Sequence, residues 1–219
     1  MSNLAMPKLT VAFKQAARTA VARSQKGIVA LILRDAAADA EALKYTLTST
    51  GQIPAALGVE NQNAIRRVFL GGVNPPKKVL VYVMASAATI AEDSAVLTWL
   101  STQKFDYLAG PADLSEAEAA VIKTWVINQR ADNYATYKAV LPNTAGNHEG
   151  VINFVANGIL VDGVTYTTAG YCGRIAGLIA GTPMQQSITY AALPEVEDIT
   201  RMTSLDMDTA VGGGKLGLY

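Results

Sequence analysis

Cysteine and histidine are almost absent from this sequence. Cys172 is the only cysteine among the 219 residues, so the chain can form no internal disulfide and has no cysteine cluster to bind zinc. His148 is the only histidine, which excludes a metal site built from several histidines and leaves one candidate base for a catalytic triad. We therefore expect no metal site, and a chain suited to a reducing cytoplasm.

Charge of one sign and long hydrophobic runs are also missing. Lys and Arg together number 18, as do Asp and Glu, so the chain has no overall positive field to attract nucleic acid or an anionic membrane. The longest apolar stretch, near 175–180, is too short to span a bilayer, and the opening MSNLAMPKLT lacks the apolar run of a signal peptide. We expect no nucleic-acid partner and no membrane partner.

Recurrent enzyme motifs are absent as well. No serine stands in a Gly-x-Ser-x-Gly elbow. The GGGK run at 212–215 is not a phosphate loop, because Thr209 stands where the first glycine of that motif belongs and Leu216 follows the lysine. Gly173 and Gly177 do not have the spacing of a dinucleotide-binding loop. We predict no catalytic residues, no cofactor-binding residues and no cofactor.

Two alternatives with a chemical site stay open. A cysteine-dependent hydrolase would have to bring Cys172, in a pattern of small helical residues, to His148, in the polar loop GNHEG. The simpler interpretation is a buried small hydrophobe and a surface histidine. The other alternative is a small nucleotide- or flavin-binding α/β protein, because parallel sheets commonly bind ligands at the carboxyl ends of their strands.

What the sequence does contain is the pattern of an α/β fold. Half of its residues are hydrophobic and 16% are charged, as in globular proteins. Apolar strands are predicted at 28–33, 77–84, 105–108 and 137–142, and amphipathic helices at about 90–103 and from about Leu114. Strands that alternate with helices predict a mainly parallel sheet with flanking helices.

The helix that begins near Leu114 has a recognisable start. Asp113 can cap its first turn, and Glu116 stands three residues later, as in a capping box. Ala117, Val121 and Trp125 recur at intervals of four, so we expect them on the inner face of this helix.

The pattern of residues changes after position 150. Within 151–166, Asn157-Gly158 and Asp162-Gly163 are dipeptides that favour type I′ turns, so we predict a small antiparallel hairpin or meander. The stretch TAGYCGRIAGLIAG predicts a helix of small residues that can pack closely against a neighbour. Residues 187–193 (SITYAAL) are interpreted as one more strand.

The N-terminal segment is interpreted as an extended arm. Leu9, Val11 and Phe13 share one face of an alternating pattern over 8–14, which is typical of a half-buried strand. We divide the chain into an N-terminal arm and linker (1–26), an α/β core domain (27–200) and a linker (201–219). The last segment ends in KLGLY, a strand-like fragment without an evident partner, and we expect the sequence to be cut short there.

Three stretches together resemble the phage tail sheath family, in the short form of Gram-positive prophages and tail-like bacteriocins. They are PKLTVAFKQAARTAVARSQKGIVALILRD, EGVINFVANGILVDGVTYTTAGYCGRIAGLIAGTPMQQSITYAALPEVEDI and LDMDTAVGGGKLGLY. The middle stretch is the most specific. Its Asn153-Phe154, its RIAGLIAGTP at 174–183 and its LPEV at 193–196 match the family's strand, helix and the segment that follows.

The resemblance implies both a fold and a function. The fold is an α/β domain that is subtilisin-like in topology but lacks the catalytic residues. The function is that of a structural subunit, which self-assembles with other sheath subunits around the tail tube protein and contracts to drive the tube through the cell envelope. Such a protein is located in the virion tail, and in the host bacterial cytoplasm during assembly.

The resemblance also gives the N-terminal segment a role. Family members carry extended arms that add strands to neighbouring subunits, so Leu9, Val11 and Phe13 are expected to form an inter-subunit arm. The sequence departs from the family at its other end, because the family's chain continues into a C-terminal domain that makes most of the inter-subunit contacts. We therefore expect these 219 residues alone to form a monomer or a small oligomer.

Overall fold

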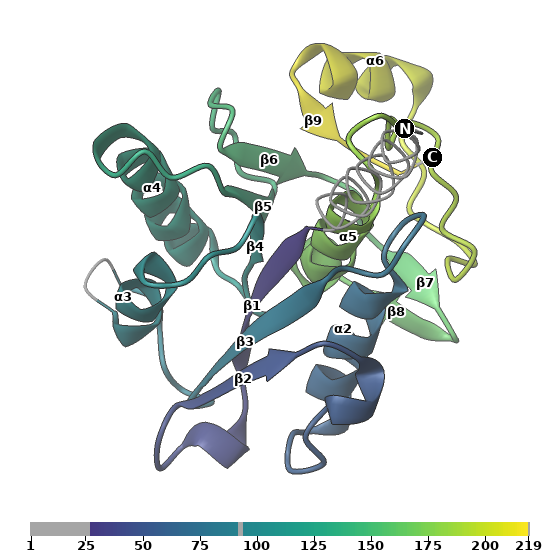
Figure 1. Ribbon diagram of the computed structural model, residues 1–219. Coiled ribbons are helices and arrows are strands. Elements are labelled where there is room, and N and C mark those ends of the chain that lie inside the picture. The colour runs from purple at the N-terminus through teal and green to yellow at the C-terminus, as the bar shows by residue number, and fades with distance from the viewer. Residues whose placement is uncertain (1–26, 92–93, 219) are drawn as a thin grey trace, which may run out of the picture.

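A computed structural model describes residues 27–91 and 94–218 of the chain (Figure 1). These residues form a sheet of 7 strands in the order β2-β3-β1-β4-β5-β6-β9, in which the pairings are parallel except that of β2 with β3. The strands are β1 (Ile28–Arg34), β2 (Leu43–Leu47), β3 (Lys78–Met84), β4 (Tyr107–Ala109), β5 (Lys138–Pro142), β6 (Val151–Phe154) and β9 (Lys215–Leu216). The predicted α/β fold with a mainly parallel sheet is confirmed.

Helices cover both faces of the sheet. The helices are α2 (Val59–Leu70), α3 (Ala95–Ser101), α4 (Glu116–Asp132), α5 (Thr168–Gly181) and α6 (Ser204–Gly212), with short 3-10 turns η1 (Ala36–Ala38) and η2 (Thr50–Gln52). α2 and α5 pack on one face, and α3 and α4 pack on the other (Figure 1). The helix expected at about 90–103 is shorter than predicted.

The central strand β1 contributes side chains to the hydrophobic core on both faces of the sheet. It lies between β3 and β4 and pairs in parallel with both. Val29 and Leu31 pack toward α2 and α5, whereas Ala30 and Ile32 pack toward α3 and α4. All four are at most 3% exposed. A strand buried on both faces needs an unbroken apolar run, and that run is what predicted it.

The predicted hairpin is present, but it is smaller than the segment 151–166. It consists of β7 (Ile159–Val161) and β8 (Val164–Tyr166), joined by Asp162 and Gly163 with positive φ angles of 50° and 73°. At the other dipeptide, only Gly158 has a positive φ, of 60°. Strand β6, which precedes it, pairs in parallel with β5 in the main sheet instead of joining a meander.

The capping residues predicted for α4 are wrong. Ser115 is the N-cap, its hydroxyl accepts from the N–H of Glu118, and the Glu118 carboxylate accepts from the N–H of Ser115 at 3.0 Å. The capping box is therefore two residues later than predicted. Asp113 pairs with Arg34 instead, so its side chain is not at the first turn of the helix.

The predicted inner face of α4 is also shifted by one residue. Ala117 is exposed, and Val121 and Trp125 are only partly buried. Apolar side chains form two adjacent rows along this helix, and the row that contains Glu118 faces the hydrophobic core. The buried residues of the helix are Glu118, Ala119, Ile122 and Val126.

The strand predicted at 187–193 is wrong. That stretch lies within residues 182–203, which run from α5 to α6 without a helix or strand of their own. Tyr190 has a positive φ of 60° there, which interrupts an extended conformation. The KLGLY fragment does have a partner, because Lys215 and Leu216 of β9 pair in parallel with β6.

Two sequence-based statements stay predictions. The proposed arm residues Leu9, Val11 and Phe13 lie outside the described residues. The division at 26 and 200 is not tested, although α6 and β9 fall within the segment that we expected to be a linker. Among the helices of the described chain, none is long and apolar enough to cross a membrane.

Candidate functional site

In an open α/β sheet, ligands bind where neighbouring strands send their connections to opposite faces. Here the chain leaves β1 toward α2 and leaves β4 toward α4, on the opposite face (Figure 1). The carboxyl ends of these strands border a crevice of about 680 Å³. This crevice is the first place where an enzyme or nucleotide site would be expected.

Arg34, the last residue of β1, lines the crevice. Its Nη1 contacts Asp113 Oδ1 at 2.6 Å, its Nη2 pairs with Glu118, and its Nε donates to the carbonyl oxygen of Ala88 at 2.7 Å. Glu118 also accepts from the N–H of Ile90 at 2.9 Å. The side chains of Arg34 and Glu118 are 10% and 9% exposed. Each of the three nitrogens of the guanidinium therefore already has a partner within the chain.

The chemistry of this crevice does not favour an anionic ligand. Burial would raise the pKa of Glu118, but hydrogen bonds from Ile90 and Ser115 and the charge of Arg34 hold that pKa below its ordinary value. A phosphate would have to compete with the carboxyl groups of Asp113 and Glu118, which already pair with the guanidinium. The crevice therefore gives no support to the nucleotide- or flavin-binding alternative.

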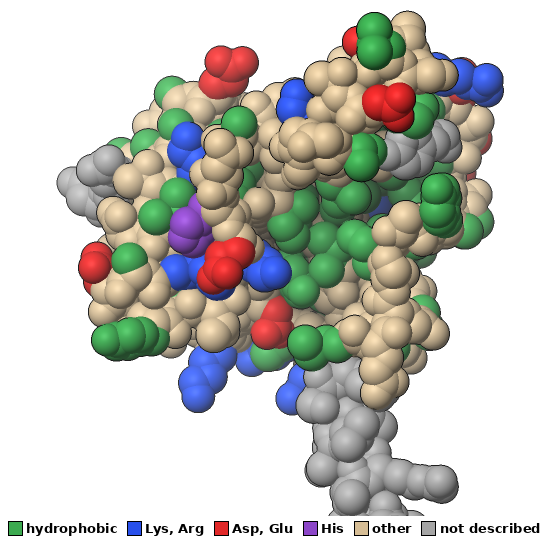
Figure 2. Space-filling model, turned by 90° about the horizontal axis from the view of Figure 1, so that it is seen from above, with side chains coloured by type: hydrophobic (Ala, Val, Ile, Leu, Met, Phe, Trp, Pro, Cys, Tyr) green, Lys and Arg blue, Asp and Glu red, His purple; other side chains and the backbone are tan. Residues whose placement is uncertain are grey.

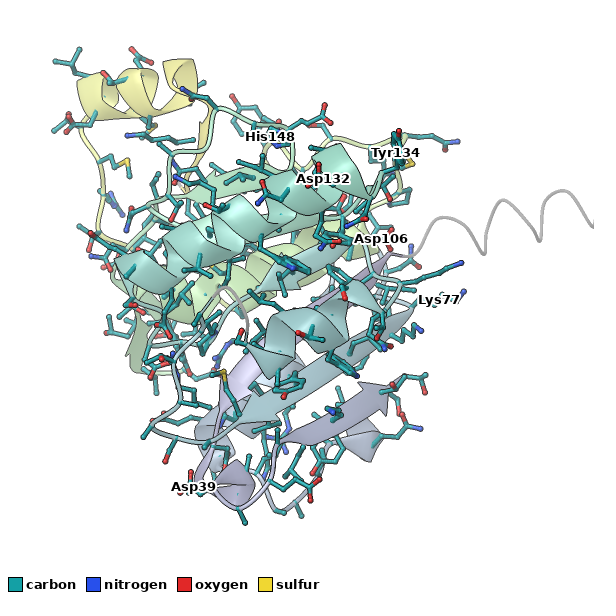
Figure 3. The ribbon with its side chains drawn as sticks, turned by 90° about the vertical axis from the view of Figure 1, so that its left-hand side faces the viewer. Asp39, Lys77, Asp106, Asp132, Tyr134 and His148 are labelled. Carbon is teal, nitrogen blue, oxygen red and sulfur yellow. The ribbon has the colours of Figure 1, made fainter. Side chains whose placement is uncertain are left out.

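The structure also separates Cys172 from His148. Cys172 is 1% exposed on α5, its Sγ contacts the carbonyl oxygen of Thr168 at 3.2 Å, and burial raises the pKa of its thiol. His148 lies in the loop before β6, beside α4 on the opposite face of the sheet, and its Nδ1 accepts from the N–H of Gly150 at 3.0 Å (Figure 3). The cysteine-dependent hydrolase is therefore not supported.

The described residues hold no group of three or more His, Cys, Asp or Glu side chains that could bind a metal ion. Within the part of the chain that the structure describes, neither the crevice nor Cys172 and His148 form a catalytic or metal-binding site.

A second hollow lies between α5, α6 and β9. We call residues 182–203, which border it, the strap, and the hollow itself the groove. The groove has a volume of about 760 Å³. Figure 2, viewed from the side of α6 and β9, shows hydrophobic side chains gathered in a hollow on this face. Its apolar lining includes Ile175, Leu178, Leu193, Val196, Ile199 and Leu216.

The surroundings of the groove expose large apolar side chains. Met184 and Tyr190 of the strap are 98% and 92% exposed, and Leu205 and Val211 of α6 are 76% and 58% exposed. Tyr190 and Val211 line the groove itself, and an exposed apolar patch commonly marks a surface for protein contacts. The groove and these four residues are therefore the candidate assembly surface.

The strap is fastened to α5 by a buried ion pair. Arg174 Nε contacts Glu195 Oε1 at 2.5 Å, and the hydroxyl of Tyr171 donates to the same oxygen at 2.8 Å. Burial would raise the pKa of Glu195, but the hydrogen bonds and charge of Arg174 and the Tyr171 hydroxyl hold it below the ordinary value. Both residues stand in motifs that resemble the sheath family, Arg174 in RIAGLIAGTP and Glu195 in LPEV, but their contact could not be predicted from the sequence.

Taken together, the fold and this surface define an α/β protein with an exposed apolar face and, among its described residues, no assembled catalytic site. A family model for the central domain of phage tail sheath proteins matches residues 86–210, which is more than half of the chain. The chain belongs to the phage tail sheath protein family.

Curated relatives agree with this assignment. The tail sheath protein of Clostridium phage phiCD119 is 37% identical over 211 residues, which cover 95% of this chain and 57% of that protein. The phage-like element PBSX protein XkdK of Bacillus subtilis is 29% identical over 110 residues, covering 50% of this chain and 23% of that protein. The chain thus spans little more than half the length of the phage relative.

Solved structures confirm the fold. The sheath tail protein of Desulfitobacterium hafniense matches with a TM-score of 0.70 at 16% identity, covering 88% of this chain and 68% of that one. The helical sheath of the anti-feeding prophage in its contracted state matches with a TM-score of 0.63 at 15% identity, covering 88% of this chain and 58% of that one.

Proposed function

We propose that this chain is part of a structural subunit of a contractile phage tail sheath, or of a tail-like particle. The observation that carries the proposal is the 37% identity to a phage tail sheath protein along 95% of the chain. A whole subunit of this kind self-assembles around the tail tube and contracts to drive the tube through the cell envelope.

The partners in this proposal are other sheath subunits and the tail tube protein. The exposed apolar residues around the groove support contacts with protein surfaces. The equal numbers of positive and negative side chains, 18 each, support dense packing of copies, because there is little self-repulsion to overcome. The subunit is placed in the virion tail, after assembly in the host bacterial cytoplasm.

The N-terminal arm is part of the same proposal. Leu9, Val11 and Phe13 would add a strand to the sheet of a neighbouring subunit, because an edge strand offers a row of backbone donors and acceptors to another chain. Within the described residues, β2 and β9 are the two edges of the main sheet, so each has one side without a partner strand.

The proposed role needs no catalysis. The paired Arg34 in the crevice, the buried thiol of Cys172 and the distant His148 support a protein that acts through its surfaces. No cofactor and no nucleic acid are part of the proposal.

The location can be tested directly on phage or tail-like particles. A short epitope tag is inserted between Asp162 and Gly163, at a turn where a side-chain carbon added to the glycine would meet no atom within 4 Å. Particles that carry the tagged protein are then labelled with gold-conjugated antibody and viewed by electron microscopy.

We expect gold particles in rows along the outside of the tail, and shorter rows on contracted tails. Untagged particles prepared in the same way are the control for background labelling. Label confined to the head, the baseplate or free protein would contradict a role in the sheath.

A further inference from the structure

The strap, residues 182–203, is a long connection without regular structure. Irregular segments of this length are uncommon inside compact domains, and those that are ordered usually serve a function. Leu193, Val196 and Ile199 pack against the core beside α5, yet no residue of the strap is fully buried. Its apolar contacts alone therefore hold it weakly compared with the sheet and the helices beneath it.

Glu195 is the charged attachment of the strap. Its carboxylate receives the guanidinium of Arg174 and the hydroxyl of Tyr171, both from α5. The side chain of Arg174 is 3% exposed and that of Glu195 is 14% exposed. Hydrogen bonds between charged groups that water hardly reaches are stronger than neutral ones, so this contact is the strongest single attachment of the strap.

Arg174 has a second contact that belongs to the core alone. Its Nη1 donates to the carbonyl oxygen of Gly71, at the end of α2, over 2.6 Å. The arginine therefore joins α2, α5 and the strap. A change at Glu195 releases the strap but leaves the bond between Arg174 and Gly71 in place.

Apart from the bonds of its end residues Thr182 and Thr203 to α5 and α6, the remaining polar attachments of the strap are backbone hydrogen bonds to the segment around hairpin β7–β8. The N–H of Leu160 donates to Asp198 at 2.8 Å, the N–H of Glu197 donates to Leu160 at 2.9 Å, and the N–H of Thr200 donates to Asn157 at 3.0 Å. None of these bonds involves a strand of the main sheet. They can open while the sheet stays intact.

We propose that the strap, which borders the groove, moves away from α5 and returns as one unit. The contact between Arg174 and Glu195 is the latch that keeps it closed. Opening uncovers Ile175 and Leu178, which are 1% and 5% exposed when the strap is in place. The use of this uncovered surface by a neighbouring subunit rests on the proposed function. The opening itself is a property of the single chain and does not depend on it.

Amide hydrogen exchange of the full chain tests the latch. In a Glu195→Gln variant we expect the N–H groups of Leu160, Glu197 and Thr200 to exchange about tenfold faster or more, because a hydrogen bond to a charged group is lost. The N–H groups of Val29–Leu33 in β1 should exchange at the wild-type rate, because the sheet does not open with the strap.

Glu197→Gln is the matched control, since Glu197 is two residues away, exposed and not part of an ion pair among the described residues. It removes the same charge and should leave the exchange rates of Leu160, Thr200 and β1 unchanged. Unchanged exchange at the three strap contacts in Glu195→Gln would overturn the latch, and so would an equal acceleration in the control or in β1.

A second variant covers the case in which Glu195→Gln does not fold. Tyr171→Phe removes one hydrogen bond to Glu195 but keeps the ion pair, so the same three amides should exchange a few-fold faster. No acceleration in a folded Tyr171→Phe protein would then count against the latch. Neither result bears on whether the particle is a sheath, which the gold labelling decides.

Discussion

Arg34 and Glu118 form an enclosed ion pair across a separation of 84 residues in the sequence. Arg34 ends the central strand β1, and Glu118 lies in the first turn of α4. Their side chains are 10% and 9% exposed. The pair lies at the place where open α/β sheets commonly bind their ligands, and here it fastens a helix to the sheet.

This pair predicts a large loss of stability on mutation. Glu118→Gln leaves the guanidinium of Arg34 without its most enclosed partner, and breaking such a buried pair costs about 3–5 kcal/mol. For a chain of this size we expect the melting temperature to fall by about 10 °C. Glu116→Gln, at an exposed position of the same helical turn, is the control and should change it by less than about 2 °C. Equal losses in the two variants, measured by circular dichroism, would contradict the role of the pair.

The same carboxylates predict how stability depends on pH. The pKa values of Glu118 and Glu195 are lowered in the folded chain from an ordinary value of 4.5. A lowered pKa stabilises the fold above the unfolded value, and this contribution is lost as the pH falls through the folded value. The free energy of unfolding by urea should therefore decrease from about pH 5 downward. In a Glu118→Gln, Glu195→Gln double variant the decrease should be shallower, and an unchanged slope would exclude these groups as its source.

The elements that were predicted correctly are those whose signal is local. The run at 28–33 is apolar throughout because β1 is buried on both faces, and Asp162-Gly163 adopts the positive φ angles that those residues favour. The small residues of 168–181 likewise predicted a closely packed helix. The fold class follows from such signals, because each strand and helix carries its own pattern.

What the sequence could not reveal depends on distant partners. SITYAAL at 187–193 has the composition of a strand, but whether a segment pairs depends on where the fold places it, and here β9 takes the position beside β6. Arg34, far away in the sequence, pairs with both Asp113 and Glu118, and this contact is not visible in the local pattern around Ser115, the actual N-cap of α4. The contact between Arg174 and Glu195 could not be predicted either, because it joins two separate segments of the chain. Each of the two residues stands in a motif that resembles the family.

Close packing between α2 and α5 predicts opposite effects for two glycines of one helix. A side-chain carbon at Gly177 would collide with the backbone of Val68, whereas one at Gly170 would meet its nearest atom at an ordinary 3.4 Å. Gly177→Ala should lower the free energy of unfolding by about 2 kcal/mol or more. Gly170→Ala should leave it unchanged or raise it by up to about 1 kcal/mol, because alanine favours a helix. Urea unfolding gives both values, and a harmless Gly177→Ala would show that α2 and α5 are not in such close contact.

The last prediction concerns the N-terminal arm, and it follows from what a strand needs. An isolated strand satisfies few of its own backbone groups, and apolar side chains such as Leu9, Val11 and Phe13 gain burial only against a sheet. Proline has no N–H to donate to a neighbouring strand. In the sheath protein that carries this chain, Val11→Pro should therefore impair assembly, as judged by sedimentation and electron microscopy.

The melting temperature of the isolated chain distinguishes an arm that pairs with a neighbouring subunit from a strand of the subunit's own sheet. If the arm pairs only with another copy, Val11→Pro should leave the melting temperature of the isolated chain within about 1 °C of the wild type, because the ladder bond it removes lies outside the subunit. Val11→Ile keeps both the N–H and the strand preference and should assemble normally. A Val11→Pro protein that assembles like Val11→Ile would show that this residue makes no ladder bond between subunits. A loss of several degrees in the isolated chain would instead place the segment within its own fold.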